Sequence, residues 1–306
     1  MTTAHKSRVL DMTRGDPFRL LLQFSLPLFC SNLLQQVYNL TDTALAGHLL
    51  GSAALAEIGA TAALYGLIMN FAFGMNNGLA LTVSRCFGAG EREGIRRAVG
   101  WMVTLSAAVS IVLTTVSLLG RGALLQVLQV PAEVWDGAAA YLTVILLGIP
   151  LTMLYNMEAA LLRAVGNSVT PLLFLLFSSV LNVGLDAAFM GPLGMGVRGA
   201  AVATVLAQGI SAVLGAVYLV RSYPELHFTL AHLKKSARRA VMNMFWAGMS
   251  MGLMSAIYNL GSVALQSSIN ALGSVYITAQ TAARRMAEMY LSLIHISEPT
   301  RLRCIS

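Results

Sequence analysis

An amide and a carboxylate lie four residues apart inside an apolar stretch of the sequence. The run over 172–190 reads LLFLLFSSVLNVGLDAAFM and contains Asn182 and Asp186. On a helix, residues spaced by four lie on one face, one turn apart. A carboxylate at membrane depth costs about 2.5–3.5 kcal/mol on insertion scales, so it faces a bundle interior or a watery cavity. The pair therefore predicts a cation or proton site. The alternative is a buried pair that only ties helices together.

A second carboxylate, Asp42, follows several amides in the apolar run over 18–49. Gln35, Gln36 and Asn39 precede it, so this run does not face lipid on every side. The amides either line a cleft or hydrogen-bond neighbouring helices. Asp42 is either a cavity carboxylate or a solvated residue near the external helix end. Two ionised carboxylates in one cavity repel each other, and a bound proton or cation relieves that repulsion.

The composition indicates a polytopic, all-α membrane protein. Of the 306 residues, 57% are hydrophobic and 11% are charged, against about 25% charged in soluble domains. The net charge is +7. The basic residues form short clusters between apolar runs, as in cytoplasmic membrane loops, which argues against a nucleic-acid partner. The three cysteines are far apart and have no metal-ligand spacing.

Motifs of enzymes are missing from the sequence. It has no P-loop, no glycine-rich nucleotide fingerprint, no HExxH and no GxSxG. An intramembrane enzyme would need a nucleophile–base or metal-ligand set within the spans, and none is visible. We therefore expect no catalytic residue, no organic cofactor and no use of ATP.

Apolar runs alternate with loops that are rich and poor in Lys and Arg, which predicts the topology. We expect a cytoplasmic tail over 1–17, a six-helix lobe over 18–220 and a basic cytoplasmic linker over 221–241, with an amphipathic helix at the interface. Residues 242–290 would open a second lobe with spans seven and eight. Near the cytoplasmic end of the fourth span, Glu158 and Arg163 are candidates for an ion pair.

An internal repeat supports this division. The tripeptide YNL at 38–40 recurs at 258–260, and LGS at 50–52 recurs at 272–274. Units with an even number of spans are parallel repeats about an axis along the membrane normal. A second six-helix unit would need four further spans. Residues 291–306 break the apolar pattern, and we interpret them as a non-native tail, the alternative being a natural polar one.

Three segments together resemble the multidrug and toxic compound extrusion (MATE) family. They are LTDTALAGHLLGSAALAEIGA at 40–60, LLGIP with the later ALLRAVGNSVTP over 146–171, and LNVGLDAAFMGPLGMGVRGAAVATVLA at 181–207. The resemblance implies twelve spans in two six-helix lobes with a V-shaped central cleft. It also implies export of organic cations in exchange for H⁺ or Na⁺.

The resemblance also assigns site residues. It places Asp42 in one cavity with Asn182 and Asp186, and it makes Thr204 a further oxygen ligand, so that these four form a proton site or a Na⁺ site. The alternative for Thr204 is a hydroxyl bonded to its own helix. The matching substrate-cavity residues are Tyr141 and Asn156, to which we add Gln35 and Asn39. The alternative for Tyr141 is an interfacial belt position.

We therefore predict a secondary antiporter in the plasma membrane, multi-pass, with a cytoplasmic N-terminus and a monomeric full-length form. Its partners would be small organic cations and the lipid bilayer. A lipid or oligosaccharide flippase of the same superfamily is the alternative, but it would need basic residues in the cleft, and the first-lobe spans are acidic and neutral. A non-transporting, half-length membrane subunit is the other alternative.

Overall fold

The computed structural model describes residues 16–234 and 237–301, and these residues form helices and no strand. The elements are α2 Pro17–Leu50, α3 Ser52–Gly88, α4 Arg92–Leu119, α5 Arg121–Val127, η1 Ala132–Val134, α6 Trp135–Ala164, α7 Val169–Met190, α8 Gly196–Ser222, η2 Pro224–Leu226, α9 Leu230–Lys234, α10 Arg238–Asn270 and α11 Ser274–Arg301. The expected tail over 1–17 lies almost wholly outside the described residues.

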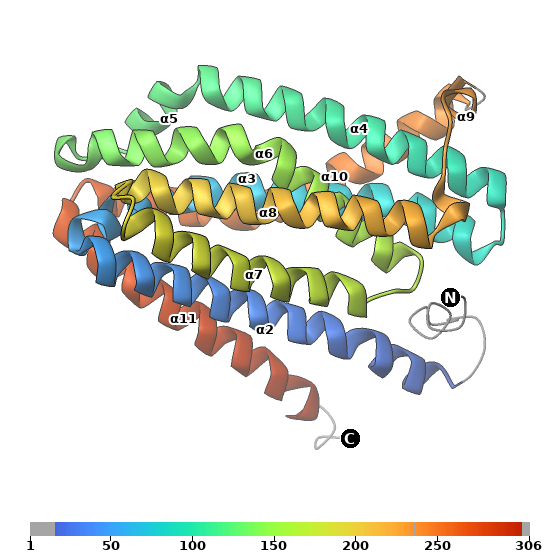
Figure 1. Cartoon of the computed structure of the whole chain (residues 1–306), viewed down its shortest axis with the longest axis horizontal. Coiled ribbons are helices and arrows are strands. Elements are labelled where there is room, and N and C mark those ends of the chain that lie inside the picture. Colours follow the sequence, from blue (N-terminus) through green and yellow to red (C-terminus); the bar gives the residue numbers. More distant parts are fainter. Residues whose placement is uncertain (1–15, 235–236, 302–306) are drawn as a thin grey trace.

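Seven of the described helices are long and apolar enough to cross a membrane: α2, α3, α4, α6 with η1, α7, α8 and α10. They run side by side in one elongated bundle, with α11 along α2 (Figure 1). Large apolar side chains such as Ile111, Val180 and Ile257 are more than 60% exposed. In water such a surface would be unfavourable, whereas lipid tails cover it without cost. The expected all-α polytopic membrane fold is confirmed.

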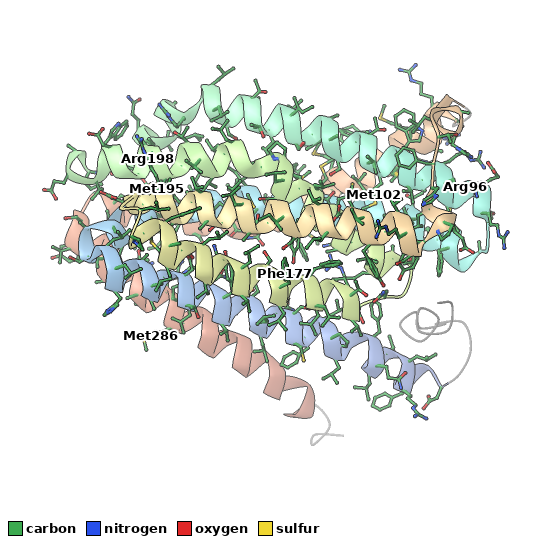
Figure 2. All side chains as sticks on the ribbon, viewed as in Figure 1. Arg96, Met102, Phe177, Met195, Arg198 and Met286 are labelled. Atoms are coloured by element: carbon green, nitrogen blue, oxygen red, sulfur yellow. The ribbon has the colours of Figure 1, made fainter. Side chains whose placement is uncertain are left out.

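The two ends of the bundle differ in charge. One end carries the α2–α3, α7–α8 and α10–α11 turns, and the opposite end carries the α3–α4 and α6–α7 turns and α9 (Figure 1). Arg96 and Arg198 mark these opposite ends in Figure 2. The α3–α4 end is the more basic, since Arg92, Arg97, Arg221 and Arg238 also lie there. This is the end that the positive-inside rule assigns to the cytoplasm.

The helices extend beyond the apolar runs that predicted them. Helices α2 and α3 are joined by Gly51 alone, whose φ of 86° favours glycine. Gly273 ends the turn between α10 and α11 with a φ of 102°, so the repeated LGS tripeptide makes similar turns. The connection between α4 and α6 contains α5 and η1. The linker's helix, α9, is only five residues long.

Helix α3 forms the centre of the bundle and has buried residues along most of its length. It packs against α10, α6, α4 and α11. Gly78 of α3 faces Ala247 and Gly248 of α10, and a Cβ atom at position 78 would lie 2.5 Å from the Ala247 carbonyl oxygen. Gly74, one turn earlier, faces Met251 and Ser255. Small residues spaced by four allow two membrane helices to approach this closely.

Substituting Gly78→Ala should therefore destabilise the chain. The clash is with backbone atoms that cannot rotate away, and overpacking of this kind costs about 1–3 kcal/mol. The matched control is Gly261→Ala in α10, where a Cβ atom meets nothing within 4 Å and alanine gains about 0.8–1.0 kcal/mol of helix propensity. In thermal unfolding, Gly78→Ala should melt lower and Gly261→Ala equal to or higher than the original chain. Equal melting of the two variants would contradict the close crossing.

Candidate cation site

The amide and carboxylate of α7 meet α8 in the interior of the bundle. Asp186 is fully buried and Asn182 is 1% exposed. The amide orientation that satisfies both of its ends donates from Asn182 Nδ2 to Asp186 Oδ2 at 2.8 Å and accepts from the Thr204 backbone N–H at 3.2 Å. The Thr204 hydroxyl donates to the Ala200 carbonyl at 3.0 Å. The expected Asn182–Asp186–Thr204 cluster therefore exists as a set of contacts.

Helix α2 brings Asp42 to the same place. Helices α2 and α7 pack together, and the carboxyl groups of Asp42 and Asp186 lie within hydrogen-bonding reach of each other. Oδ1 of each residue is buried and has no hydrogen-bond partner among the described residues. Two carboxyl groups can share such a contact only with a proton or a cation between them, because two bare carboxylates repel.

Tyrosines lie near the carboxylate pair. The Tyr38 side chain lies close to that of Thr204, and the Tyr65 side chain lies close to that of Gln208. Tyr141 of α6 is 7% exposed and lies close enough to Asp42 for an electrostatic interaction between the two side chains. Tyr141 is therefore buried beside the pair and does not lie in an interfacial belt.

Sequence reasoning missed Tyr38, Tyr65 and Gln208 as members of this cluster. Helical spacing could have found two of them, because Tyr38 lies four residues before Asp42 and Gln208 four residues after Thr204. The position of Tyr65 on α3 depends on how α3 packs against α8, which no local pattern encodes.

Arg285 of α11 brings a positive charge close to Asp42. Arg285 donates from Nε to the Thr43 hydroxyl at 3.2 Å, and its guanidinium acts electrostatically on the neighbouring Asp42. This contact joins the region expected to open the second lobe to the first lobe. Sequence analysis did not single out Arg285, since its chemistry depends on the docking of α11 against α2.

The other predicted cavity residues make hydrogen bonds within their own helices. Gln35 donates to Asn39 Oδ1 at 3.3 Å within α2, and both side chains are half-buried. Asn156 donates to the Thr152 carbonyl of its own helix at 2.9 Å. It follows Tyr141 by fifteen residues on α6, which is about 22 Å, so the structure does not bring Asn156 to the carboxylate pair.

The expected ion pair between Glu158 and Arg163 is wrong. Arg163 donates to Asn77 Oδ1 at 3.2 Å and lies 5.5 Å from the centroid of the Phe73 ring. Residues spaced by five point about 140° apart around a helix, so the two side chains diverge. The described residues include the ion pairs Arg96–Glu93 and His232–Glu93.

The donor set limits the chemistry of the site. It offers two carboxylates, one amide and several hydroxyl groups. Apart from the amide nitrogen these are oxygen ligands, and such a set suits a hard cation or a proton. Over 16–234 and 237–301, no group of three His, Cys, Asp or Glu side chains could hold a metal ion. The predicted Na⁺ site would thus depend on neutral oxygens around the two carboxylates.

Comparison with known proteins places the fold in a family. The MatE family profile matches residues 27–188, which include both carboxylates and Asn182. The chain belongs to the MatE family. The chain is 28% identical over 279 residues to the probable multidrug resistance protein YpnP of Bacillus subtilis, covering 91% of this chain and 62% of that protein. It is also 28% identical to the probable multidrug resistance protein NorM of Thermotoga maritima, covering 73% and 49%.

Solved structures of MATE transporters have the same fold. An inward-facing multidrug resistance MATE family transporter superposes with a TM-score of 0.76 at 25% identity, over 87% of this chain and 60% of that one. An outward-facing MATE structure gives 0.74 at 23% identity, over 96% and 73%. The chain spans about three fifths of the length of the first curated relatives that it matches.

Proposed function

We propose that this MATE chain belongs to a secondary antiporter that exports small organic cations in exchange for Na⁺ or H⁺. The observation that carries the proposal is the contact between Asp42 of α2 and Asp186 of α7, whose Oδ1 atoms have no hydrogen-bond partner among the described residues. Two carboxylates held together in a bundle interior bind a positive charge. The multidrug names of the relatives indicate the class of exported compound.

Each residue of the site has a role in this proposal. Asp42 and Asp186 supply the negative charge, Asn182 orients Asp186 through its 2.8 Å hydrogen bond, and Thr204 supplies a neutral oxygen. Gln35, Asn39, Tyr141 and Asn156 would line the path of the substrate. Coupling needs only that the ion and the drug differ in their affinity for the inward- and outward-open states.

Both coupling ions fit the donor set. A proton would occupy the contact between the two carboxyl groups. Na⁺ would need several oxygens at once, and Asp42, Asp186, Thr204 and the nearby tyrosines provide them. We also propose a plasma-membrane location and a cytoplasmic N-terminus. The orientation is supported by α2, which begins at the basic end of the bundle (Figure 1). The full-length form would act as a monomer.

The test is transport by everted membrane vesicles that contain the full gene product. With an imposed pH or Na⁺ gradient, ethidium should move across the membrane. An anionic dye of similar size should not. Vesicles without the protein and vesicles without a gradient are the controls. Movement of a fluorescent phospholipid instead of ethidium would contradict the proposal and favour a flippase. Ion binding without transport of either probe would favour the half-length subunit.

A further inference from the structure

A buried carboxyl group lies in the half of the bundle that we assign to the cytoplasmic side, away from the Asp42–Asp186 pair. Glu158 of α6 is 4% exposed, and Ser211 of α8 is fully buried. Neither Glu158 Oε1 nor Ser211 Oγ has a hydrogen-bond partner among the described residues. Buried side-chain oxygens rarely lack a partner, so two of them beside one cavity need an explanation.

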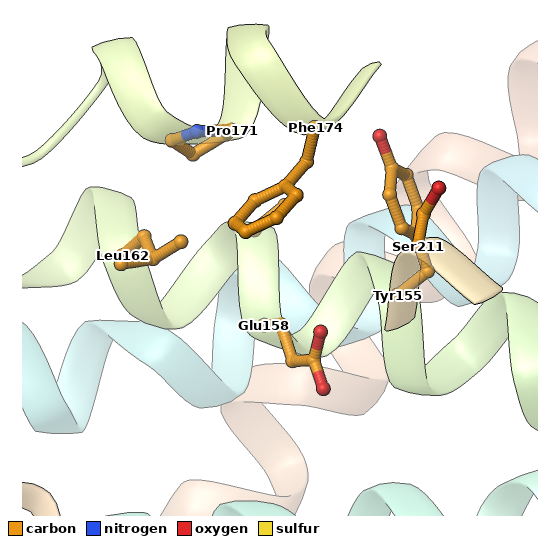
Figure 3. Close-up of a pocket in the computed structure, with 7 residues that line it drawn as sticks. Tyr155, Glu158, Leu162, Pro171, Phe174 and Ser211 are labelled. Atoms are coloured by element: carbon orange, nitrogen blue, oxygen red, sulfur yellow. The ribbon is translucent and has the colours of Figure 1, made fainter. Parts of the chain in front are cut away.

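The two side chains line a small cavity between α6, α7 and α8. Its volume is about 10 Å³, and Tyr155, Pro171 and Phe174 form further parts of its wall (Figure 3). A space of this size is at the lower limit for one water molecule. A methyl group at Gly215 of α8 would overlap Oε2 of Glu158. The glycine therefore leaves the room that the carboxyl group occupies.

None of the described residues that line this cavity is a Lys, Arg or His. Helix α7 contributes Pro171 and Phe174, and α8 contributes Ser211 and Gly215. On α6 itself, Tyr155 is the only other titratable lining residue. Arg163, also on α6, is directed toward Asn77 and Phe73 of α3. An unpaired ionised carboxylate in such surroundings costs far more than a missing hydrogen bond, and proteins avoid this cost by neutralising the group.

We propose that Glu158 is a proton-binding site of the first lobe, separate from the Asp42–Asp186 pair, and that the adjoining cavity holds the water through which the proton is exchanged. The cavity offers too few oxygens for Na⁺, because hard cations require several. Ser211 follows Thr204 by seven residues on α8, about 10 Å. Helix α8 therefore contacts both sites. This inference does not rest on the antiport proposal.

Infrared difference spectra between pH values test the proposal on the full chain in vesicles of phosphatidylethanolamine and phosphatidylglycerol. The chain with Asp42→Asn and Asp186→Asn provides the background, because these changes remove the carboxyl signals of the pair. The C=O stretching band of a protonated, buried carboxyl group should remain in this background and be lost on adding Glu158→Gln. The matched control is Glu225→Gln, which alters an exposed carboxylate and should leave the band in place.

Ser211→Ala provides an independent check if Glu158→Gln does not fold. It removes a hydroxyl group beside the carboxyl group without changing its charge, so the band should stay and shift in frequency. Absence of a protonated carboxyl band from the background, or its survival in Glu158→Gln, would overturn the proposal. An unshifted band in Ser211→Ala would overturn the role of the shared cavity. These spectra report proton occupancy and not transport, so failure here is distinct from failure of ethidium export.

Discussion

Replacing Asp186 with Asn should abolish ion-coupled export and at the same time raise the melting temperature of the chain. The new amide has the shape of the carboxylate but no charge. It removes the repulsion that Asp42 and Asp186 exert on each other when both are ionised and no ion is bound, which at about 4 Å and an effective dielectric constant near 20 is up to about 4 kcal/mol. We expect a net gain of about 1–3 kcal/mol, because Arg285 already offsets part of the repulsion.

The loss of function has the same cause as the gain in stability. In the proposed antiporter, Asp186 would supply one of the two charges that bind the ion, and it accepts a 2.8 Å hydrogen bond from Asn182. Hydrogen bonds to charged groups contribute about 1.5–3 kcal/mol, which corresponds to roughly 10- to 150-fold in affinity. Export driven by a pH or Na⁺ gradient should therefore fall at least tenfold, and loss of the charge itself should lower it further.

Thermal unfolding with and without the coupling ion separates the two effects. An ion at about one hundred times its Kd stabilises a protein by about 2.7 kcal/mol, so the original chain should melt higher with the ion and Asp186→Asn should not respond. Asp136→Asn, an exposed carboxylate in the first turn of α6, is the control and should keep the full response. An Asp186→Asn chain that melts lower and still responds to the ion would exclude this pair as the site.

Residue types and spacing predicted the core of this site because the information is local. Asn182 and Asp186 share a face of one helix whatever surrounds it, and a carboxylate in an apolar run implies a polar interior. The positions of the helices followed from runs of apolar residues. The ends of the helices could not be predicted in this way. Helices α3 and α4 continue beyond their apolar runs with polar residues, and a hydropathy profile does not distinguish such residues from a loop.

Contacts between distant helices could not be predicted in the same way. The failed Glu158–Arg163 ion pair rested on nearness in sequence, yet a spacing of five residues turns the two side chains apart. Arg285 lies 243 positions after Asp42 and reaches it only because α11 docks along α2. Asn156 matched a family position, but the fold places it well along α6 from the carboxylate pair.

Replacing Arg285 with Gln should tighten ion binding at the carboxylate pair and lower the stability of the ion-free chain. The guanidinium interacts electrostatically with Asp42, and its Nε donates to the Thr43 hydroxyl. Its positive charge therefore partly neutralises the carboxylate that would attract the coupling ion. Opposite charges within about 4–6 Å alter ionic equilibria by about one to three powers of ten. We expect about a tenfold lower Kd for the coupling ion. Without the ion, the free energy of unfolding should fall by about 1–3 kcal/mol, because the carboxylates lose the positive charge beside them.

Calorimetric or fluorescence titration with the coupling ion measures the first effect, and thermal unfolding without the ion measures the second. Arg239→Gln is the matched control, because it removes an exposed arginine at the N-terminal end of α10 and keeps the net charge equal to that of Arg285→Gln. Both chains should respond alike if only overall charge matters. A Kd that falls in Arg285→Gln alone would show that α11 supplies a tethered cation that the coupling ion must displace, which links ion binding to the contact between α11 and α2.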